Sequence, residues 1–76
     1  MKYLVVVEQT ESGFSAYSPD VPGCVATAQS RADVEREIAD AISFHLEGMQ
    51  AEGLELPTPH ASTAYIEIPS AGSHGA

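Results

Sequence analysis

Basic residues are scarce in this 76-residue chain, which has three Lys and Arg against eleven Asp and Glu and a formal net charge of -8. Proteins that bind nucleic acids use clustered Lys and Arg side chains to neutralise phosphates. Lys2, Arg31 and Arg36 are too scattered to form such a cluster, so direct binding of DNA or RNA is disfavoured. Excess acid keeps a small protein soluble and also suits a basic partner, so the charge alone leaves both explanations open.

The chain also lacks a second cysteine and any long apolar run. Cys24 alone cannot form an internal disulfide, which is typical of a reduced, cytoplasmic protein. The apolar run at residues 3–7 is far too short for a signal peptide or a membrane span. A chain of this length allows one domain with a marginal core, and such domains often gain stability by oligomerising.

Three stretches before residue 30 have the composition of β-strands. They are rich in β-branched and apolar residues, and they are separated by a polar turn ending in Gly13 and by the turn at Pro22-Gly23. The predicted strands cover residues 2–8, 14–18 and 24–29. Because the connections are short, the strands are expected to form an antiparallel meander.

One long amphipathic helix is predicted after the meander. Ser30 is a typical N-cap residue, and Gly53 suits the position just beyond a helix C-terminus. The apolar residues between them recur at helical spacing: Val34, Ile38, Ala41, Ile42, Leu46 and Met49. The helix is therefore expected from about residue 31 to residue 52, with one face covering the sheet.

Residues 63–68 predict a fourth strand, which Pro69 ends. A right-handed crossover would place this strand beside the first strand and parallel to it, so that the sheet order is 3-2-1-4 in a β-β-β-α-β, α+β fold. The first strand would then be central, which accounts for its apolar residues on both faces. Since the helix covers one face only, we expect a homodimer or homotetramer. Residues 1–69 form the expected domain, followed by a disordered tail at 70–76.

The histidines and the cysteine do not have the spacing of a metal site. His45, His60, His74 and Cys24 show neither a C-x-x-C nor an i,i+4 helical pattern. His45 falls within the apolar stripe of the helix and is expected to pack in the core or in an interface. Cys24 is expected to be buried, because free cysteine is among the most buried residue types.

The acidic residues leave one enzymatic alternative, which is a degenerate two-metal nuclease. Such an enzyme needs carboxylates that converge from strand ends and a helix. The candidates are Glu8, Glu37, Asp40 and Glu67. The helix acids lie mostly opposite the apolar stripe and should point into solvent. The sequence therefore favours a protein with no enzymatic activity, metal or cofactor.

The exposed face of the helix carries more acid than local pairing can use. Arg31 can pair with Glu35, and Arg36 with Asp33 or Asp40. Acids near the helix C-terminus even oppose the helix dipole. A basic partner would account for the surplus. The candidate partner-binding residues are Asp20, Glu35, Glu37, Asp40 and Glu47.

A longer motif connects these elements. Gly13-Phe14-x-Ala16 leads into the turn Pro19-Asp20-Val21-Pro22-Gly23-Cys24, and a capped acidic helix with a Pro57-x-Pro59 exit follows. In this order, over residues 3–59, the chain resembles the HicB family of antitoxins from prokaryotic toxin–antitoxin pairs. The resemblance implies a truncated ribonuclease H fold without its catalytic acids, in agreement with the predicted β-β-β-α-β order.

The resemblance also implies a partner, a small basic toxin of the HicA type that cleaves mRNA and whose active site the antitoxin covers. The helix acids or the edge of the third strand could form the contact. Only eight residues follow Ile68, so the C-terminal DNA-binding domain of many family members is not expected. Some members have no evident toxin. A solo oligomeric regulatory or ligand-binding domain is therefore the second hypothesis.

Overall fold

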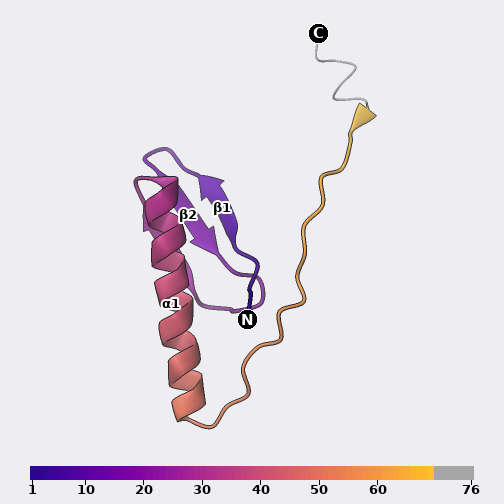
Figure 1. The fold of residues 1–76 in the computed structure, drawn as a ribbon. Coiled ribbons are helices and arrows are strands. Elements are labelled where there is room, and N and C mark those ends of the chain that lie inside the picture. Colours follow the sequence, from indigo (N-terminus) through magenta and orange to yellow (C-terminus); the bar gives the residue numbers. More distant parts are fainter. Residues whose placement is uncertain (70–76) are drawn as a thin grey trace.

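A three-stranded antiparallel sheet lies against one long helix in the computed structural model, which describes residues 1–69 (Figure 1). The strands are β1 (Val6–Gln9), β2 (Phe14–Tyr17) and β3 (Val25–Ala28), and the helix α1 spans Arg31–Ala51. The predicted meander and helix are confirmed, although each strand is shorter than expected. The tail predicted at 70–76 lies outside the described residues.

The sheet register explains how the helix packs against it. Ala16 in β2 lies opposite Val7 in β1 and Ala26 in β3, and this row faces α1. The small alanine side chains let α1 approach the centre of the sheet closely, where it buries Val34 and Ile38. On the other face, Val6, Tyr17 and Val25 form a second apolar row, of which Tyr17 and Val25 are exposed. Apolar residues therefore occur on both faces of the sheet, as predicted.

Both ends of α1 are set by the residues that the sequence indicated. The Ser30 side chain accepts a hydrogen bond from the Asp33 backbone N–H at 3.1 Å, which satisfies one of the free donors of the first turn. Gly53 has a φ of 75°, which favours glycine, and the Leu54 N–H donates to the Met49 carbonyl at 2.9 Å. This bond pattern is a Schellman cap, so the helix ends where the chain turns sharply.

The loop between β2 and β3 contributes to the core. Val21 is completely buried in it, together with Cys24, against Ile38 and Ile42 of α1. Gly23 has a φ of 90°, as expected for the second central residue of a Pro-Gly turn. The motif from Pro19 to Cys24 therefore shapes a loop that folds inward and closes the end of the core.

Residues 63–68 do not form the predicted fourth strand. They are extended but pair with no strand among residues 1–69, and the sheet order is β1-β2-β3. Tyr65 is 105%, Ile66 73% and Ile68 55% exposed. Figure 1 shows this segment standing apart from the sheet. The predicted order 3-2-1-4 is therefore wrong for the single chain. β1 is an edge strand rather than a central one, and the ribonuclease H-like arrangement is not formed.

The base of this segment is hydrogen-bonded to the body of the protein. The Tyr3 hydroxyl donates to the Pro57 carbonyl oxygen at 2.7 Å. One carboxylate oxygen of Asp20 accepts from the backbone N–H groups of His60 at 3.1 Å and Ala61 at 2.9 Å, and the other lies 3.1 Å from His60 Nδ1. These bonds fix the connector, residues 54–61, against the body. We call the free residues 62–68 beyond it the arm.

Replacing Asp20 with alanine should release the connector. The carboxylate is 3% exposed and accepts two backbone N–H bonds, so we expect Asp20→Ala to lower the free energy of unfolding by about 2 kcal/mol. Urea denaturation measures this loss, and hydrogen exchange should show faster exchange at the His60 and Ala61 amides. Glu11→Ala removes the same charge from an exposed turn and should change neither. Unchanged protection of those two amides in Asp20→Ala would contradict the anchoring role.

Candidate protein-binding surface

Three of the predicted partner-binding acids lie at exposed positions on one side of α1. Helical spacing places Asp40 and Glu47 opposite the buried Val34 and Ile38, and Glu37 on the flank next to Asp40. They form one stripe along the helix because residues three, four and seven apart share a face. Three of the five predicted acids are therefore brought together.

Phe44 lies within the same stripe. It is 80% exposed and stands four residues after Asp40 and three before Glu47. We call Glu37, Asp40, Phe44 and Glu47 the outer stripe. A large aromatic ring held in water among acids contributes nothing to the core, whereas such rings are typical anchors of protein interfaces. Phe44 was not among the predicted partner-binding residues, and its spacing from Asp40 and Glu47 is the sequence signal that assigns it to the acidic face.

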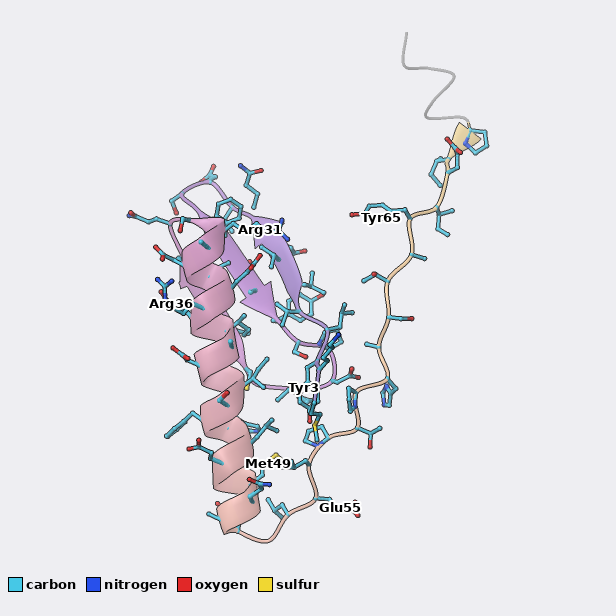
Figure 2. All side chains as sticks on the ribbon, in the orientation of Figure 1. Tyr3, Arg31, Arg36, Met49, Glu55 and Tyr65 are labelled. Carbon is cyan, nitrogen blue, oxygen red and sulfur yellow. The ribbon has the colours of Figure 1, made fainter. Side chains whose placement is uncertain are left out.

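The outer-stripe acids have no ion-pair partner within residues 1–69. Arg31 Nε lies 2.8 Å from Glu35 Oε2, and Arg36 pairs with Asp33. Figure 2 shows Arg31 and Arg36 on different sides of α1. Both helix arginines are thus engaged by other carboxylates, as the sequence predicted. The negative charge of the outer stripe therefore remains uncompensated.

Glu35 and Asp20 do not belong to this surface. Glu35 lies roughly 180° around the helix from Phe44 and, with its partner Arg31, lines a groove beside the N-terminal segment. Asp20 is buried and both of its carboxylate oxygens contact the connector. The prediction that Asp20 contacts a partner thus disagrees with its place in the fold, where it holds the chain's own backbone.

An apolar groove adjoins the outer stripe at the C-terminal end of α1. With 21 residues the helix is about 31 Å long, whereas a strand of four residues spans about 13 Å. The end of α1 therefore overhangs the sheet, as the position of Met49 in Figure 2 shows. The groove beneath it has a volume of about 510 Å³, and its lining includes Val25, Phe44, His45, Met49 and Leu54. We call it the overhang groove.

His45 is exposed in the overhang groove rather than packed in the core. Its helical spacing matches the buried stripe, and the expectation of core packing is wrong because the sheet does not extend far enough to cover it. An interface role for His45 stays a prediction. The side chain is available to a partner that occupies the groove.

Cys24 is buried, as expected, with its Sγ 3.8 Å from the Ala41 carbonyl oxygen. Burial removes water from around the thiol and raises its pKa. The thiolate is the reactive form, so a raised pKa and poor access both make Cys24 a weak nucleophile. It serves as a packing residue at the end of the inward-folded loop.

Alkylation tests this assignment of Cys24. At neutral pH we expect iodoacetamide to react with the native protein much more slowly than with the urea-unfolded chain. Since the folded-state pKa is raised, the neutral thiol stabilises the fold below the pKa of the unfolded chain, and this contribution is lost as the pH rises through the folded-state pKa. Equal alkylation rates for the folded and unfolded protein would show that the thiol is accessible.

No site for a metal ion forms within the described part of the chain. Among residues 1–69, no three His, Cys, Asp or Glu side chains gather closely enough to hold one. Glu8 is on β1 and Glu67 is on the arm, so the carboxylates suggested for a degenerate nuclease do not converge there. The same residues include no helix that is long and apolar enough to cross a membrane.

The fold and the outer stripe define a class of protein, a small α+β domain whose most distinctive exposed feature is an acidic, aromatic-centred helix face. The model of one family, described as the HicB-like antitoxin of bacterial toxin–antitoxin systems, matches residues 3–71. The chain belongs to this family. The resemblance found in the sequence is thereby confirmed.

Individual relatives agree with this assignment. An uncharacterized 14.9 kDa protein from the rep-hol intergenic region of Haemophilus phage HP1 is 35% identical over 69 residues, which are 91% of this chain and 52% of the phage protein. A UPF0150 protein of Helicobacter pylori is 34% identical over 64 residues, which are 83% of this chain and 89% of that protein. The chain thus spans about half the length of the phage relative and most of the Helicobacter relative.

Two solved structures have the same fold. A chain of the HicA3 and HicB3 toxin-antitoxin complex superposes with a TM-score of 0.67 and is 31% identical, over 96% of this chain and 86% of that one. The crystal structure of antitoxin HicB3 also gives a TM-score of 0.67, with 32% identity over 79% of this chain and 44% of that one. Three antiparallel strands followed by one helix are therefore the HicB-like arrangement.

Proposed function

We propose that this chain is the antitoxin of a toxin–antitoxin pair and that it neutralises a small, basic, mRNA-cleaving toxin of the HicA type by covering its active site. The observation that carries the proposal is the outer stripe, whose three acids lack ion-pair partners within residues 1–69 and surround the exposed Phe44. The HicA3 and HicB3 complex supports it, since a chain of that complex has this fold. The proposed role is binding, without catalysis, metal or cofactor.

Charge explains why an acidic helix face suits such a toxin. An enzyme that cleaves RNA must present positive groups to the phosphates of its substrate. Exposed carboxylates at Glu37, Asp40 and Glu47 would meet those groups in place of phosphates. The opposite charges also attract one another before contact, which speeds association at low salt. The antitoxin would thus bind the same positive groups that the toxin needs to hold its RNA substrate.

The apolar part of the surface would supply most of the affinity. Exposed charge pairs contribute little each, whereas a buried aromatic anchor commonly dominates an interface. Phe44 belongs both to the outer stripe and to the lining of the overhang groove, so one partner could cover the two together. Val25 and Leu54 are exposed at this groove and would be buried by the same contact. We propose this combined surface as the toxin contact.

Truncating Phe44 tests the anchor. We expect Phe44→Ala to weaken the affinity for a HicA-type toxin by at least about tenfold, because an interface aromatic of this kind contributes about 1–2 kcal/mol or more. The side chain is 80% exposed, so stability in urea should be unchanged. Titration calorimetry measures the affinity, and rescue of growth in cells that express the toxin reports on neutralisation. Full affinity in Phe44→Ala would exclude the outer stripe as the contact.

Reversing the charge of the stripe tests the electrostatic part. Glu37→Lys combined with Asp40→Lys should slow association with the toxin and flatten its dependence on salt, because charge steering is screened over about 8–10 Å at physiological ionic strength. Thr27→Lys on β3 is the matched control, since it adds positive charge at the sheet edge that the sequence analysis also considered. Loss of binding in Thr27→Lys alone would move the contact to that edge. If no toxin associates with the unmodified protein and it rescues no toxin-expressing cells, the solo-domain hypothesis takes precedence.

A further inference from the structure

Gly48 is an unusual residue for the interior of α1. Inside a helix, glycine is less favourable than alanine by roughly fivefold in the folding equilibrium, because it loses more backbone freedom. Glycine is nevertheless required where φ is positive or where another segment approaches the backbone closely. Gly48 meets neither condition, since Gly23 and Gly53 are the glycines with positive φ within residues 1–69, and a methyl group added at Gly48 would find no neighbouring group of those residues within 4 Å. The chain by itself therefore gives no reason for a glycine at this position.

The absent side chain leaves a gap in the wall of the overhang groove. Phe44 lies one turn before Gly48 and Glu52 one turn after it, and all three residues line this groove. Phe44 and Glu52 stand about 12 Å apart along the helix axis, with the bare backbone of Gly48 between them. We call this gap the Gly48 notch. A group that crosses it can approach the helix backbone more closely than any side chain at this position would allow.

One side of the Gly48 notch is apolar and the other is negative. Phe44, Met49 and Leu54 provide apolar surface in the groove. Glu52 has no ion-pair partner within residues 1–69, and the last turn of α1 has no basic residue to offset the partial negative charge of its carbonyl end. Lys and Arg side chains match both sides, because each has an apolar stem and a cationic head. The exposed ring of Phe44 also attracts such a cation.

We propose that Gly48 is a specificity-determining residue of the toxin contact, and that a Lys or Arg side chain of the toxin crosses the Gly48 notch with its stem on the glycine backbone and its cation at Glu52. This role rests on the proposed function and adds to it the position that decides how closely the toxin approaches α1. A toxin with an apolar or acidic residue at that place would leave Glu52 covered and unpaired, which disfavours a wrong partner. The stability that Gly48 loses in the free chain is then offset in the complex.

The first test fills the Gly48 notch. Gly48→Ala and Gly48→Leu should both raise the urea midpoint of the isolated protein, because the space is open and both residues are better helix formers than glycine. The affinity for the HicA-type toxin that binds the unmodified protein should fall, by at least about tenfold for Gly48→Leu and by less for Gly48→Ala, because the added carbon atoms occupy the notch. Gln50→Leu is the control, since it adds an apolar side chain to the same end of α1 outside the groove, and it should bind the toxin as tightly as the unmodified protein.

Stability and affinity that move in opposite directions would support the contact, because a purely structural role for Gly48 would not produce this combination. Full affinity in Gly48→Leu together with weakened affinity in Phe44→Ala would overturn the role of the notch and leave the proposed function standing. No toxin binding by the unmodified protein would overturn both. A change in the molar mass of isolated Gly48→Leu, measured by light scattering, would show that a second copy of the chain occupies the notch, and this too would overturn the proposal.

The second test identifies the basic side chain. Glu52→Gln keeps the shape of the residue and removes its charge, so it should weaken toxin binding. Glu55→Gln is the control, because Glu55 is exposed beyond the end of α1 and does not line the groove (Figure 2), and it should not change binding. Single Lys or Arg residues of the toxin are then changed to Met, and we expect one of these changes to abolish the further effect of Glu52→Gln in a double-mutant cycle. Additive effects of Glu52→Gln with every such toxin variant would overturn the proposal.

Discussion

The buried Asp20 carboxylate is the interaction on which the arrangement of this chain depends. It lies in the loop whose neighbour Val21 fills the core, and it accepts hydrogen bonds from the His60 and Ala61 amides. A buried carboxylate is costly unless its oxygens are bonded, and here the chain's own connector supplies the donors. The bond therefore links the inward-folded loop to the point where the arm leaves the body. In the turn motif that this chain shares with its family, Asp20 therefore holds the chain's own backbone. This explains why Asp20 is not part of the proposed binding surface.

A mismatch in length between α1 and the sheet determines which side chains remain available to a partner. The N-terminal part of the helix covers the strands and buries Val34, Ile38 and Ile42. The C-terminal part extends past the sheet, so His45 stays exposed in the overhang groove although its helical spacing matches the buried residues. A sheet with longer strands would cover His45, whereas Phe44 lies in the outer stripe and would stay exposed. The overhang groove is thus a consequence of the strands being much shorter than the helix.

Sequence signals that act between neighbouring residues predicted the helix ends correctly. The wrong predictions concern contacts between parts of the chain that are far apart in sequence. Ser30 and Gly53 end the helix as expected, because capping depends on bonds to neighbours in sequence. The periodicity that placed His45 in the core describes a direction around the helix and does not say how far the sheet extends. The strand pattern at 63–68 likewise describes a segment that suits a sheet, but it does not identify which sheet. The hydrogen bonds of Asp20 join residues 40 and 41 positions apart, which no spacing rule in the sequence anticipates.

The exposed arm also affects how long a molecule of this protein would last. Proteases bind extended backbone whose N–H and C=O groups are free, and cleavage concentrates at segments that are not held by the fold. Beyond Ala61 the arm has these properties, whereas the connector before it is held by Tyr3 and Asp20. A molecule whose arm is uncovered should therefore be cut sooner than one whose arm is paired. The lifetime of the chain would then depend on whether a partner covers its arm.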